Sequence, residues 1–253
     1  RQMCIRDRKK ELVEKLNIIL KNYIEAFAFP FSITILFRDS FNYGALSKET
    51  MATVSKNKTY KIILHSKIMH YIAEEKYNLV NSIIYHECLH IYDIYSIRKN
   101  PLYNFNPCSS KYRNYASFIM SIGFQFWTEF YAYAKTFEYY KEYYSYKTIY
   151  QLAKDYKKIQ EKSKNIKFLS EHAEQINRLD AVEDDMKMFL YMLARTAAGS
   201  IFGKKRKYEY SSKTQNLKEY TYVKKRLDVL IKMMKKMTHG TYGKYLYLSL
   251  IHI

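Results

Sequence analysis

The spacing of apolar residues predicts mixed helix and strand in the first part of the chain. Between residues 11 and 27 apolar side chains recur every three or four positions, which is the period of an amphipathic helix. Two runs rich in β-branched and aromatic residues then predict β-strands, FSITILF at 31–37 and TYKIILHSKI at 59–68. The turn-rich segment between them ends in SKNKT, at 55–59, which is also expected to be a turn.

After the second strand the pattern becomes almost wholly helical. Helices are predicted, in chain order, at about 77–97, 115–144, 147–164, 170–201 and 215–237. An Asn- and Pro-rich loop is expected between the first two of these helices. The fold class is therefore α+β, with a small sheet in residues 9–145 and a helical region in residues 146–247.

The two ends of the chain stand apart from this pattern. RQMCIRDR at 1–8 and LSLIHI at 248–253 resemble translated sequencing-adaptor read-through of the kind that contaminates metagenomic assemblies. We therefore treat both ends as non-biological and leave them out of the fold prediction. The gene can then be cut at either end, so the absence of a signal peptide does not exclude secretion.

Composition adds little about partners. The formal charge is +19, but the abundance of Lys, Tyr, Ile and Asn is typical of AT-rich coding sequence, and a nucleic-acid footprint would cluster on one face. The longest uncharged apolar stretch, 114–128, is shorter than the about 20 residues that span a bilayer. Three cysteines make no disulfide framework, which favours a reducing, cytoplasmic location.

The motif that carries chemistry is HECLH at 86–90. On a helix His86 and His90 lie about 40° apart and one turn above each other, so both imidazoles can reach one metal ion. Glu87 lies on the flank of that face, where it can touch a metal-bound water, and this spacing recurs in zinc peptidases. We predict His86 and His90 as zinc ligands and Glu87 as the general base. The alternative is a pair of ordinary histidines with no metal.

A catalytic zinc site needs a third protein ligand, and Glu129 is the best candidate. It stands in a run of apolar residues, QFWTEFYAYA at 125–134, where a lone carboxylate is costly to bury unless it is paired or bound to a metal. Ala132, about one turn on, is small enough to let another helix approach closely. The alternative is a glutamate at a solvent-facing point of an amphipathic helix.

Two further residues are candidates for supporting roles. Asp93 returns to the helix face of His86 and could orient a ligand imidazole, although a plain surface aspartate is an equal alternative. Tyr133, one turn after Glu129, is a candidate for stabilising an oxyanion. Cys88 points away from the predicted metal face, and we expect it to pack in the core.

HECLH at 86–90 and WTEFYAYA at 127–134, with a strand before the first, together resemble gluzincin-type zincins, in particular the ImmA/IrrE-like metallopeptidases and related phage or mobile-element peptidases. The resemblance covers about residues 30–140. It implies a zincin-like fold in which Zn²⁺ is held by His86, His90 and Glu129, and in which Glu87 is the base. It also implies a protein or peptide substrate, often a repressor or other regulator, sometimes alongside a DNA-binding module. The 39 positions from His90 to Glu129 are a long spacing for this pattern.

The leading hypothesis is thus a cytoplasmic zinc-dependent metallopeptidase. In zincins the strand before the motif lines the cleft and pairs with extended substrate, and we expect the same here. One alternative is a nucleic-acid-binding or scaffold protein of a mobile element, which the charge and the basic run GKKRKYEY at 203–210 favour. Another is a catalytically dead zincin used as a binding module. It would hold zinc and be indifferent to Glu87→Gln.

Overall fold

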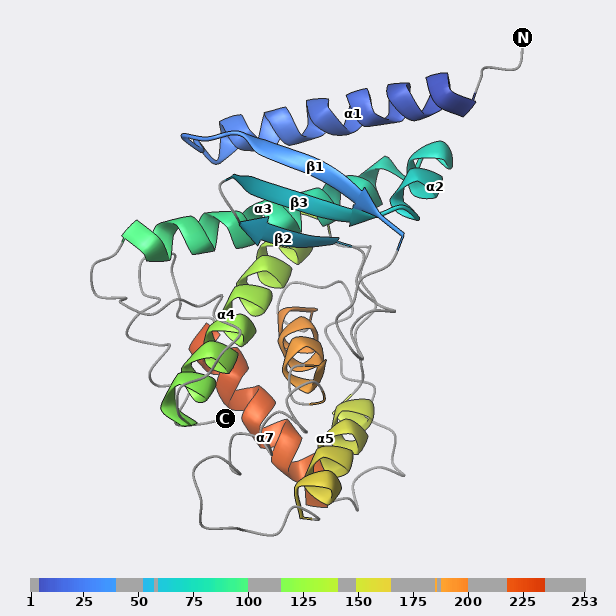
Figure 1. Cartoon of the computed structure of the whole chain (residues 1–253). Helices are drawn as coiled ribbons and strands as arrows, with labels where there is room; N and C mark the ends of the chain where they lie inside the picture. The colour runs from blue at the N-terminus through green and yellow to red at the C-terminus, as the bar shows by residue number, and fades with distance from the viewer. Residues whose placement is uncertain are drawn as a thin grey trace. The chain divides into compact units, whose positions relative to one another are not determined.

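The computed structural model describes residues 5–39, 52–56, 59–99, 115–140, 149–164, 185, 188–199 and 218–234. The chain divides into two compact units, Arg1–Tyr103 and Asn104–Ile253 (Figure 1). The sequence pattern predicted a later boundary, between residues 145 and 146. The first unit is the α+β part and the described elements of the second are helices, which confirms the predicted fold class at that level.

The first unit is a small mixed sheet with helices. Its elements are α1 (Ile5–Ala26), β1 (Ile33–Arg38), β2 (Ala52–Lys56), β3 (Tyr60–His65), α2 (Ile68–Ala73) and α3 (Tyr77–Lys99). The strand order is β1-β3-β2, with β1 parallel and β2 antiparallel to the central β3. Ile35 and Val54 both pair with Ile62, one from each side. Helix α1 contacts β1 and α3, and α3 contacts β2 and β3 (Figure 1).

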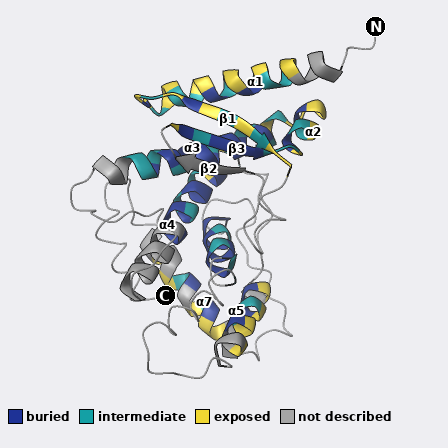
Figure 2. Ribbon diagram, viewed as in Figure 1, coloured by how far each residue is buried: buried dark blue, intermediate teal, exposed yellow. Residues whose placement is uncertain are grey.

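The core of this unit lies between the two long helices and one face of the sheet. Alternate residues of a strand point to the same face, so Ile62 and Leu64 of β3 face the same way. Both are completely buried, together with Leu16 of α1 and Ile84 of α3. Figure 2 shows buried residues along β3 and α3. Helix α3 is therefore anchored along its length by apolar burial, which fixes the side chains that it carries.

Helices α1 and α2 end in the same backbone motif without a glycine. After α1, the amide of Phe29 donates to the carbonyl of Ile24, and Ala28 has φ 49°. After α2, the amide of Lys76 donates to the carbonyl of Tyr71, and Glu75 has φ 58°. These are Schellman motifs, whose left-handed position is usually glycine. Sequence patterns that look for glycine therefore miss both ends.

The predicted opening helix, the first strand and the helix over 77–97 are confirmed as α1, β1 and α3. The second predicted strand is too long, because β3 ends at His65 and α2 begins at Ile68. The turn expected at 55–59 is wrong at its start, since Ser55 and Lys56 belong to β2. The expectation that the strand before the motif pairs with substrate is also wrong, because β3 is the central strand and pairs with β1 over Tyr60–His65 and with β2 over Tyr60–Leu64.

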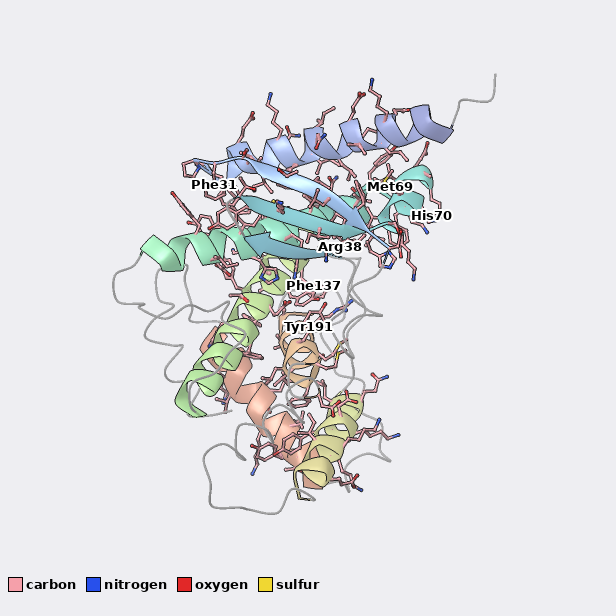
Figure 3. The ribbon with its side chains drawn as sticks, in the orientation of Figure 1. Phe31, Arg38, Met69, His70, Phe137 and Tyr191 are labelled. Atoms are coloured by element: carbon pink, nitrogen blue, oxygen red, sulfur yellow. The ribbon has the colours of Figure 1, made fainter. Side chains whose placement is uncertain are left out.

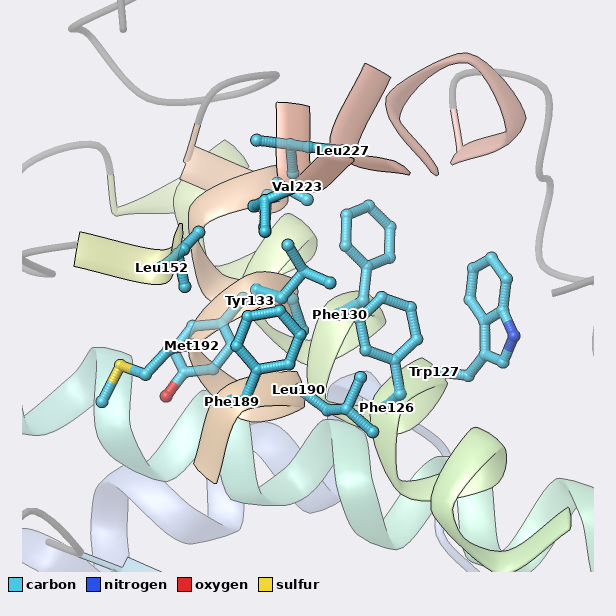
Figure 4. Close-up of a cluster of buried hydrophobic side chains, with 14 of the residues drawn as sticks. Phe126, Trp127, Phe130, Tyr133, Leu152, Phe189, Leu190, Met192, Val223 and Leu227 are labelled. Atoms are coloured by element: carbon cyan, nitrogen blue, oxygen red, sulfur yellow. The ribbon is translucent and has the colours of Figure 1, made fainter. Parts of the chain in front are cut away.

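The second unit is a helical core, built by α4 (Tyr115–Tyr139), α5 (Ile149–Lys164), α7 (Lys218–Met234) and a helix over 188–199. Its buried residues are mainly aromatic and aliphatic, and come from every one of these helices (Figure 4). Phe126 and Phe130 of α4, Leu152 of α5 and Leu227 of α7 are examples. The apolar face of each helix thus packs on the others, as its amphipathic pattern predicts.

The predicted helices of this unit are confirmed where the structure describes them, with one shorter end. Helix α4 ends at Tyr139 and Tyr140 is not helical, whereas the pattern placed the end near 144. Parts of the predicted helices at 170–201 and 215–237, the loop from residue 100, the basic run at 203–210 and the segment 248–253 lie outside the described residues. Among the described helices, none is long and apolar enough to cross a membrane.

Candidate metal centre

The two motif histidines face each other on α3. Nε2 of His86 lies 3.1 Å from Nε2 of His90, and the rings are nearly perpendicular, with centroids 4.7 Å apart. The four-residue spacing places them one turn apart, as predicted from the sequence. His86 is 6% exposed and His90 is half-buried. The pair therefore sits at the margin of the core, with the two Nε2 atoms close together.

Glu87 and Cys88 occupy the next two positions of α3. Glu87 is buried, which is unusual for a carboxylate that has no function or partner. Cys88 is completely buried in the core of the first unit, which confirms its predicted packing role. Burial raises the pKa of the Cys88 thiol, and the nearby Glu87 carboxylate raises it further. Cys88 is thus a protonated packing residue rather than a metal-binding thiolate.

Asp93 is buried as well, at 1% exposed, on the same face of α3 as His86. The alternative of a plain surface aspartate is therefore wrong. A carboxylate so deeply buried needs hydrogen bonds or a charge nearby. A carboxylate beside a ligand imidazole typically fixes the tautomer and the ring orientation of that imidazole. This orienting role of Asp93 stays a prediction.

Glu129 lies on α4 between the buried Thr128 and Phe130. Its side chain is half-buried and its Oε2 atom is buried, so it does not occupy a solvent-facing point of the helix. The alternative reading of Glu129 is therefore wrong, and the expectation of a carboxylate within an apolar environment is met. One turn further along, Ala132 is completely buried.

Tyr133 is enclosed in the core of the second unit, at 2% exposed (Figure 4). Its hydroxyl donates a hydrogen bond to the hydroxyl of Tyr191, a residue that Figure 3 labels. Burial raises the pKa of Tyr133 well above the ordinary tyrosine range, and the charges of Tyr191 and Glu129 act in the same direction, whereas Arg195 acts against them. Tyr133 is therefore a neutral hydroxyl with its proton engaged. Its predicted oxyanion role stays a prediction.

Sequence reasoning did not find Tyr191 or Arg195. The guanidinium carbon of Arg195 lies 5.4 Å from the ring centroid of Tyr133, on the helix over 188–199. An arginine within an otherwise apolar run, YMLARTAAG, was the signal that could have drawn attention to it. The run carries no recognised motif, so the pattern alone did not connect it with Glu129.

The donor set of His86, His90 and Glu129 fits a catalytic-type zinc site. Two imidazoles and one carboxylate are ligands that zinc takes in hydrolases, with a fourth position left for water. Two nitrogens bound to one tetrahedral zinc lie about 3.3 Å apart, given zinc–nitrogen bonds of about 2.0 Å. The observed 3.1 Å is close to that value. Among the described His, Cys, Asp and Glu side chains, these three form the group that could hold a metal ion.

Comparison of the chain with protein-family models, with curated proteins and with solved structures found no match.

Proposed function

We propose that the chain is a zinc-dependent metallopeptidase with a zincin-like first unit. The observation that carries the proposal is the His86–His90 pair, whose Nε2 atoms lie 3.1 Å apart on a buried helix with a buried glutamate at the next position. A chance pair of surface histidines does not require Glu87 to be buried. The H-E-x-x-H spacing supplies the reason, because it places two ligands and a base around one water.

Glu129 is the third ligand in this proposal. One ligand atom from each of His86, His90 and Glu129 lies within 4.8 Å of the others, which supports a shared ion. The carboxylate also supplies one negative charge toward a divalent cation, whereas two neutral imidazoles supply none. Three protein ligands leave one position open, which separates a catalytic site from a closed structural one.

The chemistry that follows is hydrolysis of a peptide bond. Bound zinc would lower the pKa of a water molecule to about 7 and polarise the scissile carbonyl. Glu87 accepts the proton of the attacking water and then donates it to the leaving amine. The burial of Glu87 keeps its carboxylate away from bulk water, so the proton is held for the second transfer.

An extended substrate needs an open strand edge, and we place it at β2. Within the described sheet β2 pairs on one side only, with β3, and α3 contacts β2. The strand is thus next to the helix that carries the two histidines. Substrate backbone groups could pair with such an edge by β-augmentation, while alternate side chains point to either face.

The test is zinc content by mass spectrometry of the metal-reconstituted protein, with Glu129→Ala and Glu87→Gln beside the wild type. We expect about one zinc per chain in the wild type, weaker binding in Glu129→Ala, and full binding in Glu87→Gln. No zinc in the wild type would overturn the proposal. A second experiment then separates catalysis from binding. A denatured proteome is incubated with the wild type or with Glu87→Gln, and the new peptide termini are identified by mass spectrometry. We expect the wild type to produce new termini and Glu87→Gln to produce none. Zinc binding with identical termini in both would instead indicate a dead zincin.

A further inference from the structure

In the second unit, Tyr133 contacts two residues of a neighbouring helix. Glu129 and Tyr133 lie on α4, and Tyr191 and Arg195 lie on the helix over 188–199. The hydroxyl of Tyr133 donates to that of Tyr191, and the two rings meet edge to face with centroids 5.5 Å apart. Arg195 lies over the Tyr133 ring. One neighbouring helix thus holds Tyr133 both at its hydroxyl and at its ring.

This contact bears on Glu129 because residues four apart share a helix face. Fixing Tyr133 fixes the rotation and the height of the α4 face that also carries Glu129. The Glu129 carboxylate and the Arg195 guanidinium both act electrostatically on the Tyr133 hydroxyl, in opposite directions. Two opposite charges therefore act on the same hydroxyl.

Polar groups are an expensive way to join two helices in an apolar core. Elsewhere α4 contributes apolar side chains such as Phe126 and Phe130 to the core, as Figure 4 shows. Tyr191 and Arg195 are half-buried, and a phenylalanine and a leucine in their place would fill similar space with less desolvation of polar groups. What the polar pair adds is direction, since a hydroxyl-to-hydroxyl hydrogen bond and a cation over a ring each restrict geometry.

We propose that Tyr191 and Arg195 are positioning residues for Glu129, and that they hold its carboxylate in the orientation that binds a divalent metal ion. The inference rests on the proposed function, because it takes Glu129 as a ligand. Neither residue is among the proposed metal ligands. They act through Tyr133, in the way that outer-shell partners of metal ligands act elsewhere.

The experiment measures zinc affinity of the full chain by competition with a chromophoric chelator, for Tyr191→Phe, Arg195→Met and Arg195→Lys. We expect zinc binding to weaken about tenfold or more in the first two variants. Arg195→Lys should keep most of the affinity, because an ammonium group can also sit over the ring. Matched controls are Tyr222→Phe and Lys225→Met on α7, both at exposed positions, and neither should change zinc affinity.

A second readout distinguishes positioning from simple stability. Thermal unfolding of each metal-free variant is followed by the fluorescence of Trp127, the chain's one tryptophan, which is buried on α4. Variants that unfold at lower temperature but bind zinc like the wild type, measured where they are folded, would overturn the proposal. If Arg195→Met does not fold, the zinc affinities of Tyr191→Phe and Arg195→Lys are used to test the proposal instead. If the wild type binds no zinc, the metal site itself is refuted. If every variant binds zinc with wild-type affinity, only the positioning role is refuted.

Discussion

Nε2 of His86 lies 3.1 Å from Nε2 of His90 across one turn of α3. Without a cation, one of these nitrogens must carry a proton to make a favourable contact, because two lone pairs at this distance repel. With a cation, both lone pairs can point at it, and each neutral ring then carries its proton on Nδ1. The same geometry therefore serves a metal-free and a metal-bound state, with only a tautomer change between them.

Replacing either histidine should remove the zinc site. His86→Ala and His90→Ala each delete one of the proposed ligands, so we expect zinc affinity to fall by more than the about 10–100-fold that outer-shell changes cost. Isothermal titration calorimetry with zinc measures the affinity of each variant. His70→Ala is the matched control. His70 is exposed on α2, so the His70→Ala variant should bind zinc with the affinity of the wild type. Equal affinity in all three variants would rule out the motif as the site.

Asp93 should tune the site without being part of it. Asp93→Asn keeps the shape of a 1% exposed side chain but removes its negative charge, so the predicted orienting of a ligand imidazole by a carboxylate would be weakened. We expect zinc affinity to fall by about 10–100-fold. The control is Asp228→Asn on α7, where the side chain is half exposed and pairs with Lys224. If Asp93→Asn binds zinc normally yet unfolds more easily, the aspartate has a structural role only.

The sequence predicted the motif helix and its ligands better than it predicted the sheet. Helix α3 combines a long, largely apolar segment with a motif whose spacing has a geometric meaning, so local information was sufficient. Strand β2, ATVSK, is short and half polar, and only its pairing with β3 makes it a strand. Helix α2 is six residues long and is held by the burial of Ile68 and Ile72, which is also a tertiary effect.

The supporting residues of the site show the same limit. Glu129 was found because a carboxylate in an apolar run is conspicuous in sequence. Tyr191 and Arg195 lie about 60 positions away from it along the chain, in a helix that has no motif. Their relation to Tyr133 exists only once two helices are packed, so no local pattern could have predicted it.

Two helix ends offer a direct way to stabilise the first unit. Ala28 and Glu75 each occupy the left-handed position of a Schellman motif. For a residue with a Cβ atom, this conformation is about 1–2 kcal/mol less favourable than the right-handed one. Ala28→Gly and Glu75→Gly should remove that strain, and part of the gain is offset by the greater freedom of glycine in the unfolded chain. We expect each to raise the free energy of unfolding by about 0.5–1 kcal/mol, measured by urea denaturation.

The control for this prediction is Ala26→Gly, at the last residue of α1. This exposed residue is helical, so glycine should lower stability there by up to about 1 kcal/mol. Opposite signs at positions 26 and 28 would show that backbone conformation, and not composition, sets the effect. A loss of stability at position 28 would contradict the left-handed assignment.

Alkaline pH should destabilise the second unit through Tyr133. Its pKa is raised well above the ordinary value of about 10, chiefly by burial. Below that ordinary value, the folded and unfolded chains both keep the proton, and the stability due to Tyr133 is fully present. As pH rises above about 10, the unfolded chain releases the proton while the folded chain retains it, so the free energy of unfolding falls, by up to about 1.4 kcal/mol per pH unit.

Urea denaturation at pH 9, 10 and 11, followed by Trp127 fluorescence, measures this dependence. Tyr133→Phe loses the hydrogen bond to Tyr191 at every pH, so its stability is lower throughout, but its decline above pH 10 should be shallower than in the wild type. Tyr139→Phe is the control, because Tyr139 is exposed at the end of the same helix and its replacement should leave the wild-type slope unchanged. Parallel slopes for the wild type and Tyr133→Phe would mean that Tyr133 ionises as readily in the folded protein as in the unfolded chain. The buried, proton-donating Tyr133 on which the positioning of Glu129 depends would then be excluded.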